Sequence, residues 1–211
     1  MKIVKEGYNI LIAIAVAMVI SFLLKWYLLS KIIFLLLLFS LYFFRDPKRY
    51  MPKFNNAIVS PADGKILEIK EVFSNVLEKD CYKISVFMSV FDVHINRLPF
   101  TGKVKKKIYN KGKFFNASLD KASEENEKMS YIVASDNFSY MVTQIAGLIA
   151  RRIVSYTEKG DKLRTGDKIG MIKFGSRAEL LIPKEVIDIN ISEGQQVYAG
   201  ETIFGFLVNN A

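Results

Sequence analysis

The chain has 211 residues, enough for one compact domain and an additional segment. Apolar residues make up 51% and charged residues 24%, a balance that excludes a disordered polar chain. Its one cysteine, Cys81, excludes a disulfide framework and any site with several thiolates, and its one histidine, His94, excludes a multi-histidine metal centre.

Two apolar runs, Tyr8–Leu24 and Leu28–Phe44, come first along the chain. Each would form a helix about 25 Å long, at the short end of what a hydrocarbon core requires. The outer flanks are basic, through Lys2, Lys5, Arg45, Lys48, Arg49 and Lys53. Positive charge at both outer ends predicts a membrane hairpin over residues 1–53, spanning or embedded, with both ends cytoplasmic. The alternative is an apolar pair that lies in one leaflet.

Beyond Pro52 the chain consists of short β-branched and aromatic runs that are separated by turn residues. Such spacing predicts an α+β, mostly β fold over residues 54–211, with a barrel-like or sandwich-like catalytic core. The best helix candidate there is Lys121–Lys128. The expected strands are Ala57–Ser60, Lys65–Lys70, Tyr82–Met88, Gly102–Tyr109, Tyr131–Ser135, Tyr140–Ile145, Arg152–Thr157, Lys168–Lys173, Glu179–Ile182, Val186–Ile191 and Thr202–Val208.

Two segments, Ser60–Ile66 and Ile189–Ile203, each combine a strand with a tight glycine turn. They resemble the half-motifs of biotinyl and lipoyl hammerhead domains, which carry a modified lysine on a hairpin between the halves. Lys173 lies in the corresponding region but is not flanked by the methionines that such modification usually needs. The alternative function is therefore a non-enzymatic, membrane-anchored adaptor of hammerhead type.

Three residues are candidates for chemistry. Ser176 follows Gly175, and glycine permits strained backbone angles that would let the hydroxyl approach the preceding carbonyl. Asp63 precedes a glycine, where an aspartate usually forms a turn. His94 is the only side chain whose ordinary pKa lies near neutrality, so base chemistry by an imidazole must use it.

A run of lysines over residues 103–113 contains no acidic residue. Its simplest interpretation is a solvated edge strand that charge protects from aggregation. Attraction to anionic lipid headgroups is an equal alternative beside a membrane hairpin, and Lys103 and Lys105 are the candidates for it. Nucleic acid is a weaker third, because no aromatic residues alternate with these lysines as a stacking platform.

Six blocks occur in a specific order along the chain, and together they carry a family resemblance. They are Phe44–Pro47, Ser60–Gly64, Phe87–Arg97, Phe115–Glu127, Gln144–Ile153 and Phe174–Arg177. In this order they resemble the short, membrane-associated archaeal and bacterial form of phosphatidylserine decarboxylase. The resemblance covers nearly the whole chain.

The resemblance implies a proenzyme that cuts itself between Gly175 and Ser176. The serine attacks the preceding carbonyl, and elimination and hydrolysis leave a pyruvoyl group on the new chain 176–211. This chain stays with chain 1–175 as a heterodimer, and a higher oligomer is the alternative assembly. This pyruvoyl would form a Schiff base with the substrate amine and accept electrons as CO2 leaves, without pyridoxal phosphate or a metal. The implied substrate is phosphatidylserine, or a related serine phospholipid such as archaetidylserine, at the cytoplasmic face of the cell membrane.

The resemblance also implies roles for the candidate residues, with Asp63 orienting His94 and His94 activating Ser176. Longer members of the family have two histidines three residues apart, whereas this chain has His94 at the earlier position and Arg97 at the later one. Either His94 serves both self-processing and decarboxylation, or processing uses a different base. Arg97 joins Lys103 and Lys105 as a candidate for contact with substrate or lipid.

Overall fold

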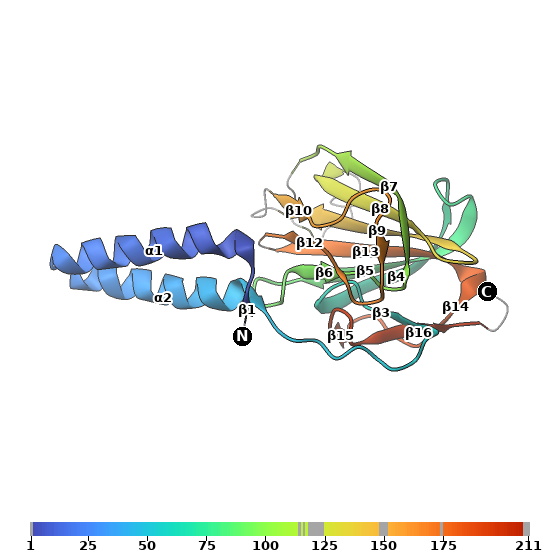
Figure 1. Cartoon of the computed structure of the whole chain (residues 1–211), viewed down its shortest axis with the longest axis horizontal. Coiled ribbons are helices and arrows are strands. Elements are labelled where there is room, and N and C mark those ends of the chain that lie inside the picture. The colour runs from blue at the N-terminus through green and yellow to red at the C-terminus, as the bar shows by residue number, and fades with distance from the viewer. Residues whose placement is uncertain are drawn as a thin grey trace. The chain divides into compact units, whose positions relative to one another are not determined.

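The computed structural model describes residues 2–113, 115, 117, 125–147, 152–173 and 175–208. The chain divides into two compact units, Met1–Lys48 and Arg49–Ala211, whose elements are labelled in Figure 1. The sequence analysis placed the basic flank up to Lys53 with the hairpin. The division falls earlier because Arg49 bonds to Asp63 and Glu201, both of which belong to the second unit.

The first unit is a helical hairpin. Helix α1 spans Lys5–Leu23 and helix α2 spans Tyr27–Phe43, while two short strands, β1 (Lys2–Ile3) and β2 (Arg45–Asp46), pair antiparallel at their outer ends. By length and composition α1 could cross a membrane, and α2 is a shorter apolar helix. Leu28 on α2 is 76% exposed. Many other apolar side chains of the two helices are also exposed, each by a smaller fraction. An apolar environment would suit this surface.

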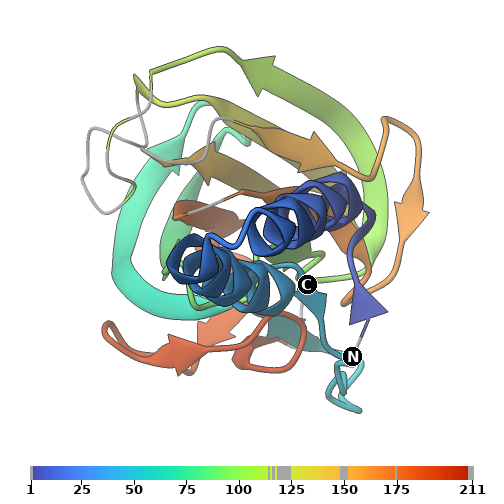
Figure 2. The same cartoon turned by 90° about the vertical axis from the view of Figure 1, so that its left-hand side faces the viewer.

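The second unit is built on a curled antiparallel sheet of eight strands, which Figure 2 shows end-on. In spatial order they are β11 (Lys162–Leu163), β7 (Gly102–Asn110), β8 (Lys128–Ala134), β9 (Ser139–Ala146), β13 (Ser176–Pro183), β5 (Lys79–Met88), β4 (Gly64–Ser74) and β15 (Gln196–Val197). Register shifts occur in β4 between Ile66 and Glu68 and in β7 between Val104 and Lys106. Bulges increase the local twist, so these irregularities help the sheet to curl.

Two smaller sheets complete this unit. One has the order β10 (Ile153–Ser155), β12 (Lys168–Ile172), β6 (Ile95–Arg97), and the other β14 (Ile187–Ile189), β16 (Ile203–Leu207), β3 (Ala57–Val59), with a short 3-10 helix over Lys184–Val186.

The two hammerhead-like half-motifs lie side by side. The N–H of Ser60 donates to the carbonyl of Thr202 at 2.8 Å, and the N–H of Gly200 donates to the carbonyl of Ser60 at 2.9 Å. Strand β15 pairs with the beginning of β4, which joins the same two segments a second time. The predicted class, mostly β with these half-motifs behind a helical hairpin, is confirmed.

Each expected strand has a counterpart in the structure. Among the described residues, the short strands β1 and β2 of the first unit and β6, β11 and β15 of the second were not expected. The most consequential difference is the start of β13, which begins at Ser176 and not at Glu179. The first half of the helix predicted over Lys121–Lys128 lies outside the described residues, and Glu125 is helical. The last residue of the predicted helix, Lys128, begins β8 instead, so the prediction is wrong there.

Strand β13 runs through the middle of the large sheet, with β9 on one edge and β5 on the other. Ala178, Leu180 and Ile182 alternate along it, are at most 1% exposed and belong to the apolar core. Ser176 has the same parity, and side chains of one parity share a face of a strand. The candidate serine therefore points toward the core.

We expect Leu180→Ala to lower the free energy of unfolding by about 2–5 kcal/mol, because the cavity would lie under the central strand. Urea unfolding of the full chain in detergent measures this loss. Val76→Ala is the control: Val76 is 52% exposed, and its truncation should change the same quantity by about 0.5 kcal/mol or less. Equal losses in the two variants would contradict the central position of β13 in the core.

Candidate active site

Ser176 lies at the point where β13 begins, opposite Met88 of β5 and Ala146 of β9. Its side chain is wholly buried, and its hydroxyl donates to the Sδ atom of Met88 at 3.4 Å. A thioether sulfur is a weak acceptor. The hydroxyl is thus buried and held by a weak hydrogen bond, which a stronger acceptor could replace.

The residue before the serine adopts a conformation that favours glycine. Gly175 has a φ of +60°, in the left-handed region. Its carbonyl oxygen packs against Gly147, where an added Cβ would lie only 2.0 Å from that oxygen. The peptide between Gly175 and Ser176 therefore sits at a turn that two glycines make possible, with its carbonyl group pressed against backbone.

His94 contacts the same turn. Its ring is fully buried, and Nδ1 lies 2.9 Å from the carbonyl oxygen of Asp92. Because a carbonyl can only accept, Nδ1 carries the proton, which leaves Nε2 as an acceptor. The N–H of Gly175 donates to Nε2 at 3.2 Å. A neutral imidazole thus presents its unprotonated nitrogen to the residue that precedes Ser176.

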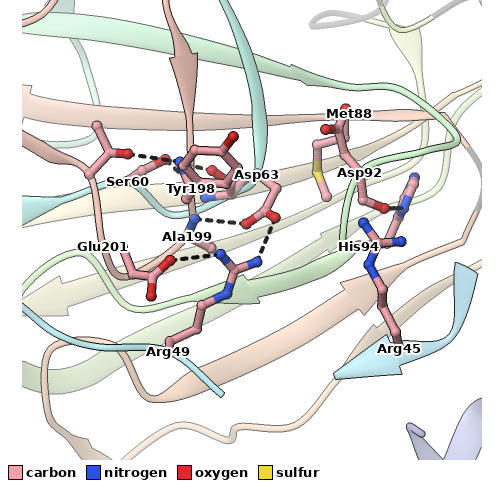
Figure 3. Close-up of polar contacts among 12 residues, drawn as sticks. Arg45, Arg49, Ser60, Asp63, Met88, Asp92, His94, Tyr198, Ala199 and Glu201 are labelled. Atoms are coloured by element: carbon pink, nitrogen blue, oxygen red, sulfur yellow. Dashed lines mark hydrogen bonds and ion pairs between the residues drawn. The ribbon is translucent and has the colours of Figure 1, made fainter. Parts of the chain in front are cut away.

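The Asp63 carboxylate, which was expected to orient His94, makes hydrogen bonds to other residues. Figure 3 shows the Asp63 carboxylate directed toward Arg49 and Ala199. One oxygen accepts from Arg49 Nη2 at 2.5 Å, and the other accepts from the N–H of Ala199 at 2.8 Å. The Nδ1 atom that Asp63 was expected to orient is bonded to the Asp92 carbonyl instead.

Arg49 connects two acids of the site. Besides Asp63, it binds Glu201, through Nη1 at 2.9 Å, and Glu201 also accepts from the N–H of Tyr50 at 2.8 Å. Burial raises the pKa of Asp63, and the charge of Arg49 opposes that rise. The side chains of Arg49 and Asp63 are only 7% and 5% exposed, so this is a buried ion pair.

Arg97 is placed differently from the expectation. It is 8% exposed, and its Nη1 donates to the carbonyl oxygen of Gly166 at 2.8 Å. The guanidinium therefore binds backbone in the interior, and its contact with substrate or lipid stays a prediction.

Lys103 and Lys105 are exposed on β7, which lies next to the short edge strand β11. With Lys162 and Arg164 they line a groove of about 890 Å³. Lys103 pairs with Ala134, at the end of the β8–β9 hairpin opposite the end where Ala146 meets Ser176. These lysines are consequently remote from the serine, and their contact with lipid stays a prediction.

Comparison with known proteins decides the family. The profile of the phosphatidylserine decarboxylase family matches residues 36–205, which include all the site residues above. The chain belongs to the phosphatidylserine decarboxylase family. The phosphatidylserine decarboxylase proenzyme of Carboxydothermus hydrogenoformans is 44% identical over 202 residues, 95% of this chain and 94% of that protein. The proenzyme of Syntrophus aciditrophicus is 44% identical over 206 residues, 96% of each chain.

Membership in the phosphatidylserine decarboxylase family makes the hammerhead-like halves a feature of the fold and leaves the adaptor function without support. Sequence reasoning missed Arg49, Gly147 and Glu201 as parts of the site. Arg49 was counted with the basic flank, and Glu201 lies in an ordinary turn. Gly147 lies within one of the six blocks, but its role comes from its contact with the carbonyl oxygen of Gly175, which is 28 positions later in the sequence.

We expect Arg49→Met to lower the free energy of unfolding by about 3–5 kcal/mol, because it leaves the Asp63 carboxylate buried without its cation. Adding Asp63→Asn to this variant should recover part of the loss. The control is Lys79→Met, which removes an ion pair to Glu185 whose partners are 50% and 54% exposed, and should cost about 1 kcal/mol or less. Urea unfolding measures all three; a loss in Arg49→Met no larger than in the control would contradict the buried pair.

Proposed function

We propose that this chain is a self-processing phosphatidylserine decarboxylase whose pyruvoyl group derives from Ser176. The observation that carries the proposal is the turn at Gly175, where a buried serine follows a left-handed glycine whose N–H bonds to His94. The similarity to phosphatidylserine decarboxylase proenzymes supports both the activity and a processing step.

Self-processing requires the Ser176 oxygen to attack the carbonyl carbon of Gly175. The hydroxyl proton passes to a base, the C–N bond breaks, the nitrogen takes up a proton, and an ester replaces the amide. Loss of the α-proton of residue 176 then expels the Gly175 carboxylate, and water replaces the nitrogen, which leaves as ammonia. The products are chains 1–175 and 176–211.

His94 is the proposed base for the first of these steps. Its Nε2 is unprotonated and accepts the N–H of Gly175. It can therefore take up a proton beside the peptide bond between Gly175 and Ser176, which is the bond that must break. The Asp92 carbonyl holds the ring in this tautomer, a role that the sequence analysis gave to Asp63. Asp63 acts in the site as the partner of Arg49 and of the Ala199 amide.

When present, the pyruvoyl group supplies an electron-withdrawing carbonyl that takes up the electron pair left by departing CO2. The surroundings of Ser176 fit such a group, because its side chain is wholly buried between Met88 and Ala146 of the neighbouring strands. Neither pyridoxal phosphate nor a metal ion is part of the proposal.

The two chains would stay together after the break. Strand β13 pairs with β9 from Ser176 to Leu181 and with β5 along its whole length, and β16 pairs with β3. These ladders join residues 176–211 to residues 1–175, so the product is a heterodimer.

The membrane hairpin would keep the enzyme beside a substrate that remains in the bilayer. α1 is long and apolar enough to span it, and the basic flanks favour the cytoplasmic side for the unit Arg49–Ala211. The substrate is phosphatidylserine or a closely related serine phospholipid.

We expect Ser176→Ala to remain one uncut chain and to release no CO2 from phosphatidylserine vesicles, because the nucleophile and the precursor of the pyruvoyl group are both lost. Mass spectrometry of purified protein follows the cut, with wild type giving chains 1–175 and 176–211. Ser192→Ala, at an exposed turn, should be cut as wild type. A Ser176→Ala chain that still splits after Gly175 would overturn the proposal.

His94→Gln separates positioning from proton transfer. A glutamine oxygen can still accept the N–H of Gly175 but is not a base, so cutting should slow by about 10²–10⁴-fold, as in His94→Ala. A time course of cutting over hours by mass spectrometry measures the rate. Normal cutting in His94→Gln with none in His94→Ala would show that His94 only positions the turn, and normal cutting in both would remove it from processing.

A further inference from the structure

Arg177, the residue directly after Ser176, carries a charge buried in the described interior. It is 1% exposed and is among the largest side chains that are fully buried. Removing a guanidinium from water is costly unless acids and hydrogen-bond acceptors compensate it. Such a charge beside the candidate nucleophile calls for a physical reason.

Three strands supply the partners of Arg177. Glu68 of β4 lies opposite Ser85 of β5, and Ser85 lies opposite Glu179 of β13, so these residues form a row across the sheet. Arg177 precedes Glu179 by two positions and shares its face. Its Nη2 donates to Ser85 Oγ at 2.7 Å and pairs with the Glu68 carboxylate, while Nε lies 2.9 Å from Oε1 of Glu179.

Glu68 is held in its charged form. Burial raises its pKa, but hydrogen bonds from Lys70 and Lys83 and the charges of Lys83 and Arg177 reverse the effect and lower the pKa to about 2. Lys83 Nζ lies 3.1 Å from the carboxylate. The acid that faces Arg177 is therefore ionised over the whole neutral range.

We propose that Arg177 is a positioning residue that anchors the Ser176 end of β13 to Glu68 and Glu179, before and after the chain is cut. The inference rests on the proposed function. Cutting would turn Ser176 into a chain end, and chain ends fray unless they are tied down. The bond from Ser176 to the Met88 sulfur is weak, whereas the anchor is one residue away.

The position of the two acids relative to the break gives the anchor its specific role. Glu68 lies in chain 1–175 and Glu179 in chain 176–211, so the pair between Glu68 and Arg177 would become a contact between chains. A second ion pair, from Lys184 to Glu71, joins the same two segments. Its side chains are 34% and 60% exposed, and it lies eight positions from Ser176, so it serves as a matched control.

The test compares wild type, Arg177→Lys, Glu68→Gln and Lys184→Gln as full chains in detergent. Lysine keeps the charge but cannot reproduce the fork of a guanidinium, and Glu68→Gln keeps Arg177 but removes the interchain acid. Mass spectrometry measures the rate of self-cutting. Phenylhydrazine titrates the carbonyl groups formed, and CO2 release from phosphatidylserine vesicles then gives kcat per carbonyl and KM.

We expect Arg177→Lys and Glu68→Gln to be cut more slowly and to lose about tenfold or more in kcat per carbonyl, since small misplacement of a reacting group is costly. KM should stay unchanged, and Lys184→Gln should behave as wild type. A loss of folded protein alone would lower the yield but not kcat per carbonyl. If Arg177→Lys does not fold, Glu68→Gln carries the same comparison.

Wild-type cutting rates and kcat in both variants would overturn the anchor, as would an equal loss in Lys184→Gln. Failure of the proposed function shows itself separately, as a wild-type chain that is not cut between Gly175 and Ser176. In that case the comparison of variants is not reached.

Discussion

Backbone pairing on both edges of β13 is the constraint on which the rest of the structure depends. The strand begins at Ser176, whose hydroxyl group lies in the interior. The backbone can be buried there because β5 and β9 provide hydrogen-bond partners for its N–H and C=O groups. In the proposed function, the same pairing would let the chain be cut after Gly175 without loss of the fold, since neighbouring strands hold β13 along its length. The proposed cleavage site is the peptide bond at which this pairing begins.

Two buried arginines stabilise this arrangement by different means. Arg49 binds Asp63 and Glu201, and so joins the start of the second unit to turns in both half-motifs. Arg177 binds acids of β4 and β13 and ties down the strand end next to Ser176. Each guanidinium is compensated by two carboxylates, which is the condition under which a buried cation is tolerated. The buried ion pairs fix the positions of the segments that they join, whereas the apolar core supplies the bulk of the stability.

Much of the architecture could be predicted from the pattern of residues. The apolar hairpin and most strands followed from periodicity, because runs of like side chains are a local property of the chain. The Gly175–Ser176 pair and His94 were singled out by residue type, since only glycine adopts the left-handed turn easily and only histidine exchanges protons near neutrality. The helix expected to end at Lys128 failed there because a polar local sequence gave no sign of the pairing that begins β8.

The sequence by itself determined which residue types were available for chemistry and that the fold would be mostly β. Only the tertiary structure decided which of these residues lie together: Asp63 binds Arg49, Arg97 lies in the interior, and Gly147 lies against the carbonyl of Gly175. Such partners come from strands that are far apart in the sequence. Strand register and the order of strands in the sheet determine which of their side chains come into contact. A shift of one residue in that register would turn Ser176 away from the core, which no local pattern can specify.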